Sequence, residues 1–260
     1  MTTIIIPVYR GLLIKEVLLS IAAQKKAVIS EIILVLNKVL IPKKADFLKI
    51  TNEFKNVKVV DIELNNVSVA RNKGLSYSKT EFTLFLDEDC LLSDPHCLEK
   101  MLQKQNTNCG VGTLFVLKGR PFKEQFYNFK INLWMQCHAE VLLAGGVSLY
   151  KTEVIKNLEF NREIDYGGSE TSLQDQIYSK NLGSFDLVIE KMVIHQVKEK
   201  WKDLFLKSKK QSLRSRTFNS IPKLQYGKLI ECFRREKDLS LGQKARILAV
   251  LGFERFWNLF

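Results

Sequence analysis

The sequence lacks the features of a membrane-spanning or secreted protein. No apolar run approaches the roughly 18 to 20 uncharged residues that cross a bilayer, and the N-terminus has neither the basic start nor the long apolar stretch of a signal peptide. Its five cysteines are odd in number and widely scattered, unlike a secreted disulfide framework. We therefore expect a cytoplasmic protein whose thiols are reduced.

Common nucleotide and zinc signatures are missing as well. The chain has neither a GxGxxG fingerprint nor a GxxxxGK(S/T) loop, which argues against a dinucleotide oxidoreductase and a P-loop enzyme. Cys90 and Cys97, with His96 beside them, form one Cys-x6-Cys spacing without a second ligand pair. This spacing favours packing within a helix over a zinc site.

The chain does contain enough apolar residues for a core and an uneven distribution of charge. Its 260 residues are 46% hydrophobic, which suits one large α/β domain or two small ones. The net charge is +12, and residues 196–260 carry 16 Lys or Arg against 6 Asp or Glu. A near-neutral body is thus followed by a basic C-terminal part.

Apolar runs alternate with amphipathic stretches in the first half of the chain. Strands are predicted at 2–9, 31–37, 57–62 and 82–87, and helices at 11–27, 43–55 and 67–78. This βαβ rhythm predicts an α/β fold: a Rossmann-like, open, mostly parallel sheet flanked by helices.

The regularity weakens beyond residue 110. Further strands are predicted at 110–117, 141–150 and 186–195, a helix begins near Glu170, and helices follow at 201–212, 222–237 and 241–260. We expect a catalytic domain over residues 1–195, divided into halves 1–109 and 110–195. A basic, helical C-terminal extension covers 196–260.

Three consecutive acids follow the strand at 82–87. Alternation along an extended segment would point Asp87 and Asp89 to one side and Glu88 to the other, so that two acids share one cation. The alternative is a polar loop after a strand. Ligands of open α/β sheets bind outside the carboxyl ends of the strands, which places 7–10, Asn37 and this triplet along one rim.

Four stretches resemble glycosyltransferase family 2, whose members have the GT-A nucleotide-sugar fold. They are IIIPVYR (4–10), VARNKGL (69–75), FTLFLDEDC (82–90) and AGGVSLYKTEVIKNLEFNREIDYGGSE (144–170). Their order and spacing fit over roughly the first 195 residues, which is more specific than any single motif. The resemblance implies a metal-dependent, inverting transfer of a sugar from a nucleotide diphosphate donor to an acceptor hydroxyl.

The resemblance also implies a set of donor-binding residues. They are Pro7, Tyr9, Arg10, Asn37, Arg71, Asn72, Asp87 and Glu88, with a structural role as the alternative for Glu88. The planar guanidinium of Arg71 can donate two parallel hydrogen bonds to phosphates or sugar hydroxyls. Asn72 is expected to order the start of the same helix. Family members commonly carry an acid that reads the base where this chain has Asn37. An amide both donates and accepts hydrogen bonds, so it can still recognise uracil, and a UDP-sugar is favoured.

Asp89 and His195 are the metal ligands that the resemblance implies. A hard divalent cation neutralises the charge that builds on a departing diphosphate. His195 ends the last strand, and an imidazole favours Mn²⁺ over Mg²⁺. The expected cofactor is therefore Mn²⁺ or Mg²⁺, although a histidine at a strand end is more often structural.

The catalytic base of the family lies in a YGGED-like stretch, which reads YGGSE at 166–170 here. Aligned on the glycines, Ser169 replaces the first acid and Glu170 takes the position of the base, with Asp165 as the fallback. On the acceptor side, two glycine pairs allow backbone to approach the substrate: Gly145 and Gly146, and Gly167 and Gly168. Turn formation alone is the alternative for both pairs.

The expected setting is the synthesis of bacterial surface polysaccharide or glycolipid, with a glycan or lipid-linked acceptor. Val250, Phe253, Trp257 and Phe260 recur at helical spacing in the basic tail, which resembles an interfacial helix on an anionic inner membrane face. Packing of the same stripe against the catalytic domain as core is the alternative. Two other functions stay open: an inactive nucleotide-sugar binder, suggested by Ser169 and Asn37, and a nucleic-acid-binding protein, which is not expected because it leaves the acidic rim unexplained.

Overall fold

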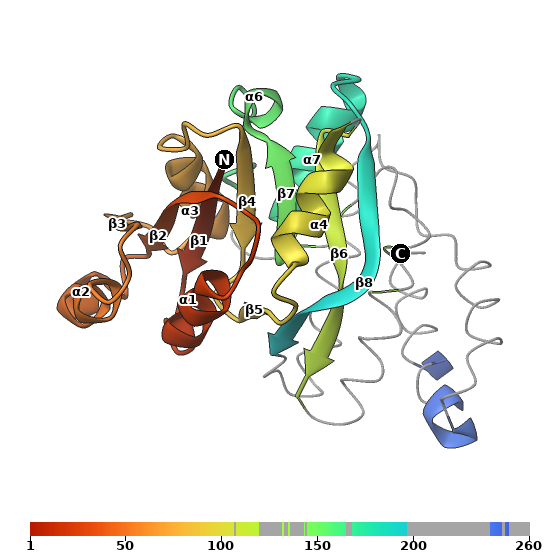
Figure 1. The fold of residues 1–260 in the computed structure, drawn as a ribbon, viewed down its shortest axis with the longest axis horizontal. Coiled ribbons are helices and arrows are strands. Elements are labelled where there is room, and N and C mark those ends of the chain that lie inside the picture. The colour runs from red at the N-terminus through yellow and green to blue at the C-terminus, as the bar shows by residue number, and fades with distance from the viewer. Residues whose placement is uncertain are drawn as a thin grey trace.

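The computed structural model describes residues 1–106, 108–119, 132, 135, 143, 145–164, 168–196, 240–245 and 248–249. Among these residues one sheet has the strands β1 (Thr2–Val8), β2 (Ile29–Leu36), β3 (Val57–Asp61), β4 (Phe82–Leu86), β5 (Cys90–Leu92), β6 (Gly110–Lys118), β7 (Val147–Lys151) and β8 (Phe185–Gln196) (Figure 1). The helical segments are α1 (Ile14–Ala22), η1 (Ile41–Lys43), α2 (Lys44–Thr51), α3 (Val67–Leu75), α4 (Cys97–Gln103), η2 (Lys104–Asn106), α6 (Thr152–Ile155) and α7 (Ser169–Ser179). None of the helices described is long and apolar enough to cross a membrane.

The strand order is β3-β2-β1-β4-β7-β6-β8-β5. The first four strands in this order are parallel, as the alternation of strands and helices predicts. β7 is antiparallel to both β4 and β6, and the short β5 is antiparallel to β8. Four of the seven neighbouring pairs are parallel, so the open α/β sheet is confirmed and its second half is mixed.

Helices cover both faces of the sheet, which explains why all seven residues of β1 are buried. Side chains alternate across a strand, so Ile4 and Ile6 enter one core while Ile5 enters the other. The first core contains side chains of α1 and α4, which lie on the viewer's side in Figure 1, and the second contains side chains of α3 and α7. The sheet is thus held rigidly between two apolar layers.

The carboxyl ends of β1, β4, β6 and β8 lie along the lower edge of the sheet in Figure 1. β5 also lies near this edge, because only the turn that contains the acidic triplet separates it from β4. The predicted rim of polar residues therefore exists. It is extended by β8, which brings His195 opposite Cys90.

Some predicted boundaries differ from the structure. The helix expected at 11–27 is limited to Ile14–Ala22, and the three-residue strand β5 was not predicted. The strand expected at 141–150 begins at Val147, because Gly145 and Gly146 form a turn. The helices expected at 201–212 and 222–237 lie outside the described residues, and so does most of the helix expected at 241–260.

Candidate active site

Glu88 holds the loop that follows β1. Its carboxylate accepts hydrogen bonds from the backbone N–H groups of Tyr9 (3.1 Å), Arg10 (2.8 Å) and Gly11 (2.7 Å). Burial raises the pKa of the Glu88 carboxyl, while these hydrogen bonds oppose the rise. The side chain thus fixes a loop at the carboxyl edge of the sheet, and Tyr9 and Arg10 stay exposed there.

The acidic triplet is not an extended segment. The backbone N–H of Cys90 donates to the carbonyl of Asp87 at 3.0 Å, so residues 87–90 form a turn between β4 and β5. The expectation of simple alternation along an extended segment is therefore wrong, whereas the sharing of one cation by Asp87 and Asp89 stays a prediction. Asp87 contacts Arg71, whereas Asp89 contacts His195.

Arg71 is a buried cation between two acids. It lies on α3 with 2% of its side chain exposed, and one guanidinium nitrogen contacts both Asp87 (2.7 Å) and Glu170. Because an unpaired charge is costly inside a protein, the two carboxylates are what make this burial possible. Burial raises the pKa of the Asp87 carboxyl, although the charge of Arg71 opposes this rise.

Asn72 does not order the start of α3, contrary to expectation. That helix is capped by Asn66, whose side chain accepts from the N–H of Val69 at 3.0 Å. Asn72 instead donates to the carbonyl of Phe160 (2.9 Å) and accepts from its N–H (2.8 Å). These bonds bring the Phe160 ring to 5.6 Å from the guanidinium carbon of Arg71, where it forms part of the wall around the cation.

Glu170 is positioned by a helix start and by a glycine. It lies in the first turn of α7, whose N-cap Gly168 has a φ of 88°, a backbone angle that favours glycine. A Cβ atom at Gly145 would lie 2.7 Å from the carboxyl carbon of Glu170, so only glycine leaves room for this carboxylate. The fallback base Asp165 and Gly167 lie outside the described residues.

Gly146 serves the neighbouring turn. It has a φ of 106°, and its carbonyl accepts from the N–H of Asp87 at 2.8 Å. A Cβ atom there would lie 3.2 Å from the sulfur of Cys90 and 3.6 Å from a carboxylate oxygen of Asp87. At this glycine pair the backbone therefore lies close to the protein's own acidic and thiol side chains, and its approach to a substrate stays a prediction.

Asn37 is bound within the chain. Its amide nitrogen donates to the carbonyls of Val8 and Tyr9, both at 3.1 Å, and its side-chain oxygen accepts from the N–H of Val39 at 2.9 Å. The side chain is buried and joins the loops after β1 and β2. Pro7 lies inside β1 and is buried as well. Both buried residues therefore support the loops at the carboxyl edge of the sheet. Recognition of the nucleobase by Asn37 stays a prediction.

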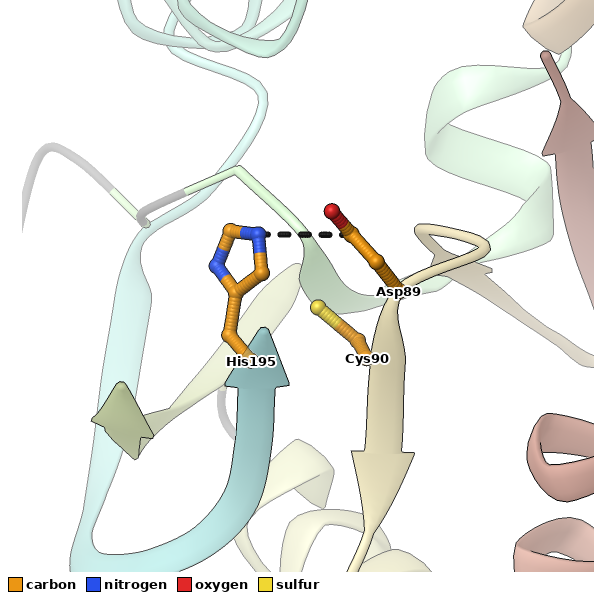
Figure 2. Close-up of side chains that lie close together, drawn as sticks. All are labelled: Asp89, Cys90 and His195. Carbon is orange, nitrogen blue, oxygen red and sulfur yellow. Dashed lines mark ion pairs between the residues drawn. The ribbon is translucent and has the colours of Figure 1, made fainter. Parts of the chain in front are cut away.

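Asp89, Cys90 and His195 form a second group beside the first (Figure 2). The Nε2 atom of His195 lies 3.3 Å from an oxygen of Asp89, and the three potential ligand atoms all lie within 4.8 Å of one another. The side chains of Asp89 and His195 are 40% and 26% exposed, so an ion can reach them. Carboxylate and imidazole suit a divalent cation, and the residues present therefore fit the expected metal.

Cys90 was not among the predicted ligands. The signal that places it there is the strand register, in which Cys90 of β5 lies directly opposite His195 of β8. These residues are far apart in sequence, and β5 itself is too short to be recognised from its apolar pattern. No local motif links the thiol to the imidazole.

Comparison with known proteins identifies the family and the fold of the chain. Residues 3–165 match the family model described as Glycosyl transferase family 2, and the sequence matches no curated protein. Mannosyltransferase PcManGT from Pyrobaculum calidifontis, in complex with GDP-Man and Mn²⁺, is 14% identical with a TM-score of 0.64, over 99% of this chain and 83% of that chain. S. aureus TarS 1-349 with UDP-GlcNAc is 17% identical with a TM-score of 0.58, over 98% of this chain and 72% of that chain.

A third similar structure is glucosyl-3-phosphoglycerate synthase from Mycobacterium tuberculosis with Mn²⁺, UDP and phosphoglyceric acid. It is 14% identical with a TM-score of 0.57, over 78% of this chain and 73% of that chain. At these identities the likenesses establish the fold, which is the expected GT-A fold.

Proposed function

Since the chain belongs to glycosyl transferase family 2, we propose that this glycosyltransferase moves a sugar from a UDP-sugar to an acceptor hydroxyl with inversion at the anomeric carbon. The observation that carries the proposal is that two groups of charged side chains meet at one turn. Asp87 of the 87–90 turn contacts Arg71, which also contacts Glu170, and Asp89 of the same turn contacts His195.

Glu170 is the proposed base. In the transfer, the acceptor oxygen bonds to the anomeric carbon, the bond from that carbon to the diphosphate oxygen breaks, and the hydroxyl proton passes to the Glu170 carboxylate. The contact with Arg71 supports this role, because a carboxylate fixed beside a buried cation has a defined direction for an incoming hydroxyl. Asp165 is the alternative base.

Asp89 and His195 are the proposed metal ligands, and Mn²⁺ or Mg²⁺ is the proposed ion. When bound, the cation neutralises the negative charge on the departing diphosphate. Asp87 then does not need to be a ligand. Its contact with Arg71 suits a role toward the ribose or the sugar of the donor.

The remaining donor contacts are proposed for the loop after β1. Tyr9 is 53% exposed, and its hydroxyl accepts a hydrogen bond from Asn65 at 3.2 Å, which orients the ring. Glu88 contributes by holding this loop rather than by touching the donor. Both amide N–H groups of Asn37 are donated to loop carbonyls, so one lone pair of its side-chain oxygen is all that this amide offers to a base. The proposed preference for UDP rests on that acceptor alone.

The acceptor is proposed to be a glycan or lipid-linked sugar at the inner membrane face, with residues 1–195 as the catalytic domain and 196–260 as a basic extension. Leu241 and Leu248 are 86% and 45% exposed, which supports a surface role for this part of the tail. An anionic membrane attracts Lys and Arg by about 1 kcal/mol each. Peripheral binding of a cytoplasmic enzyme is the resulting proposal.

A screen of nucleotide sugars tests the proposed donor and metal. We expect UDP-sugars to raise the melting temperature in the presence of Mn²⁺ and to do so much less after chelation with EDTA. Stabilisation by GDP-sugars alone would contradict the donor assignment. Salt-sensitive retention on DNA, without retention on anionic liposomes, would support the nucleic-acid alternative instead.

A further inference from the structure

The thiol of Cys90 points toward the space between Asp89 and His195 (Figure 2). Its side chain is fully buried, whereas the two partners are partly exposed. The thiol therefore lies at the inner end of the group, and the carboxylate and imidazole lie at its solvent side. An ion that enters between the latter two would meet the sulfur next.

Two backbone features hold the thiol in this place. Cys90 and His195 are directly paired in the antiparallel β5–β8 ladder, so their side chains project from the same face. The N–H of Gln196 donates to the carbonyl of Asp89 at 3.1 Å, which ties the preceding turn to the same strand. The arrangement is thus fixed by sheet hydrogen bonds and does not depend on a mobile loop.

Gly146 and the ring of Phe115 lie beside the buried thiol and the imidazole. Gly146 lies against the thiol, and a Cβ atom there would be 3.2 Å from the sulfur. The ring of Phe115 lies 6.0 Å from that of His195, with the two planes tilted by 53°. The aromatic ring limits movement of the imidazole, while the glycine leaves room beside the thiol.

We propose that Cys90 is a third protein ligand of the metal site, in addition to Asp89 and His195. This inference rests on the proposed metal-dependent function and narrows the metal that the site prefers. Two ligand atoms of one small cation lie about 3 to 4 Å apart. Asp89 and His195 already have that spacing, and the whole group lies within 4.8 Å, so the thiol needs only a small rotation.

A sulfur ligand changes the preference among cations. Thiolates favour Zn²⁺ and other soft ions, whereas oxygen ligands favour Mg²⁺. On binding, the S–H bond breaks, the proton passes to solvent, and a sulfur–metal bond forms, with no change of oxidation state. The site should therefore bind Co²⁺, Zn²⁺ and Cd²⁺ more tightly than Mg²⁺.

The competing interpretation is that Cys90 only fills the apolar core, where its side chain also packs. Free cysteines are commonly buried as small apolar residues. In that case, replacement by serine would cost stability without changing which ions bind. The two interpretations therefore differ in a spectroscopic property that packing does not affect.

Titration of the full-length protein with Co²⁺ distinguishes them. We expect a sulfur-to-cobalt charge-transfer band in the near ultraviolet, retained in Cys97→Ser and lost in Cys90→Ser. Cys97 is a matched control, because it is also a fully buried free cysteine but lies on α4. Loss of a ligand should also weaken Cd²⁺ binding at least about tenfold. Loss of residues that only hydrogen-bond to metal ligands already lowers metal affinity about 10- to 100-fold.

Folding is checked for each variant by its melting curve and by near-ultraviolet circular dichroism without metal. If Cys90→Ser does not fold, Cys90→Ala takes its place, and wild-type protein alone still reports whether the band exists. Wild-type protein that binds Co²⁺ without the band, or binds none, overturns the role of Cys90. Sugar transfer is measured separately with Mn²⁺. If the protein transfers sugar but shows no sulfur-to-cobalt band, only the role of Cys90 as a ligand is refuted. If the band is present but no sugar is transferred, only the proposed function is refuted.

Discussion

Replacement of Glu170 by glutamine removes the proposed base while keeping its size. Glutamine cannot accept the acceptor proton at neutral pH, so the transfer step loses its general base but the donor site keeps its shape. The change also removes one of the two carboxylates beside the buried Arg71. Asp87 remains at 2.7 Å and still pairs with the cation, so the fold should survive.

The two effects have different expected sizes. General-base catalysis contributes about 10²- to 10⁴-fold, so we expect kcat to fall at least roughly a hundredfold, or about 2.7 kcal/mol in the barrier. The lost contact with a charged partner should cost about 1.5 to 3 kcal/mol of unfolding free energy. For a protein of this size that corresponds to a decrease of several degrees in melting temperature, so assays well below the transition separate chemistry from unfolding.

The assay measures turnover by release of nucleoside diphosphate and donor affinity by titration. Ser169→Ala is the control. The hydroxyl of Ser169 is buried and has no hydrogen-bond partner among the residues that the structure describes, so its loss should leave turnover and stability nearly unchanged. Asp165→Asn should do much less than Glu170→Gln. If Asp165→Asn is the more damaging change, or if Glu170→Gln stays within about threefold of the parent, Glu170 is not the base.

Three further changes test other parts of the site. Asp89→Asn should keep the fold and abolish most Mn²⁺-dependent donor binding, and unchanged Mn²⁺ and nucleotide titrations would show that Asp89 is not a ligand. Gly145→Ala should lower turnover roughly tenfold or more with little change in donor affinity. The added Cβ atom would lie 2.7 Å from the carboxyl carbon of Glu170 and would displace this carboxylate. Undiminished turnover would show that the position of the carboxylate does not matter. Deletion of 241–260 should weaken sedimentation with anionic liposomes and slow transfer to a lipid-linked acceptor while sparing donor hydrolysis, whereas unfolding of the truncated protein would identify this segment as core.

The first half of the fold was predictable because each strand there is a complete apolar run followed by its own helix. β1 to β4 and their parallel order follow from that rhythm. The antiparallel insertion of β7 was not predictable, since its position depends on pairing with strands that are distant in sequence. β5 is too short to show a pattern of its own.

The candidate site was predictable where the resemblance supplied residue types, and less so where geometry decides their partners. Glu170 and Arg71 were expected as the base and a donor-binding residue, but their direct contact depends on α7 meeting α3 and on a glycine at 145. Glu88 was expected either to bind the donor or to have a structural role, and its three backbone partners in the loop after β1 support the structural role. Hydrogen bonds of this kind join residues about 78 positions apart, which no local spacing reveals.

The stereochemistry of the reaction tests the central claim most directly. Purified protein is incubated with an α-linked UDP-sugar, Mn²⁺ and an acceptor, and the anomeric configuration of the product is read from its proton NMR coupling constants. A single displacement with Glu170 as base predicts a β-linked product together with UDP, both formed at least roughly a hundredfold more slowly by the Glu170→Gln variant. An α-linked product, or tight donor binding without any transfer across a panel of acceptors, would contradict the proposal of an inverting glycosyltransferase.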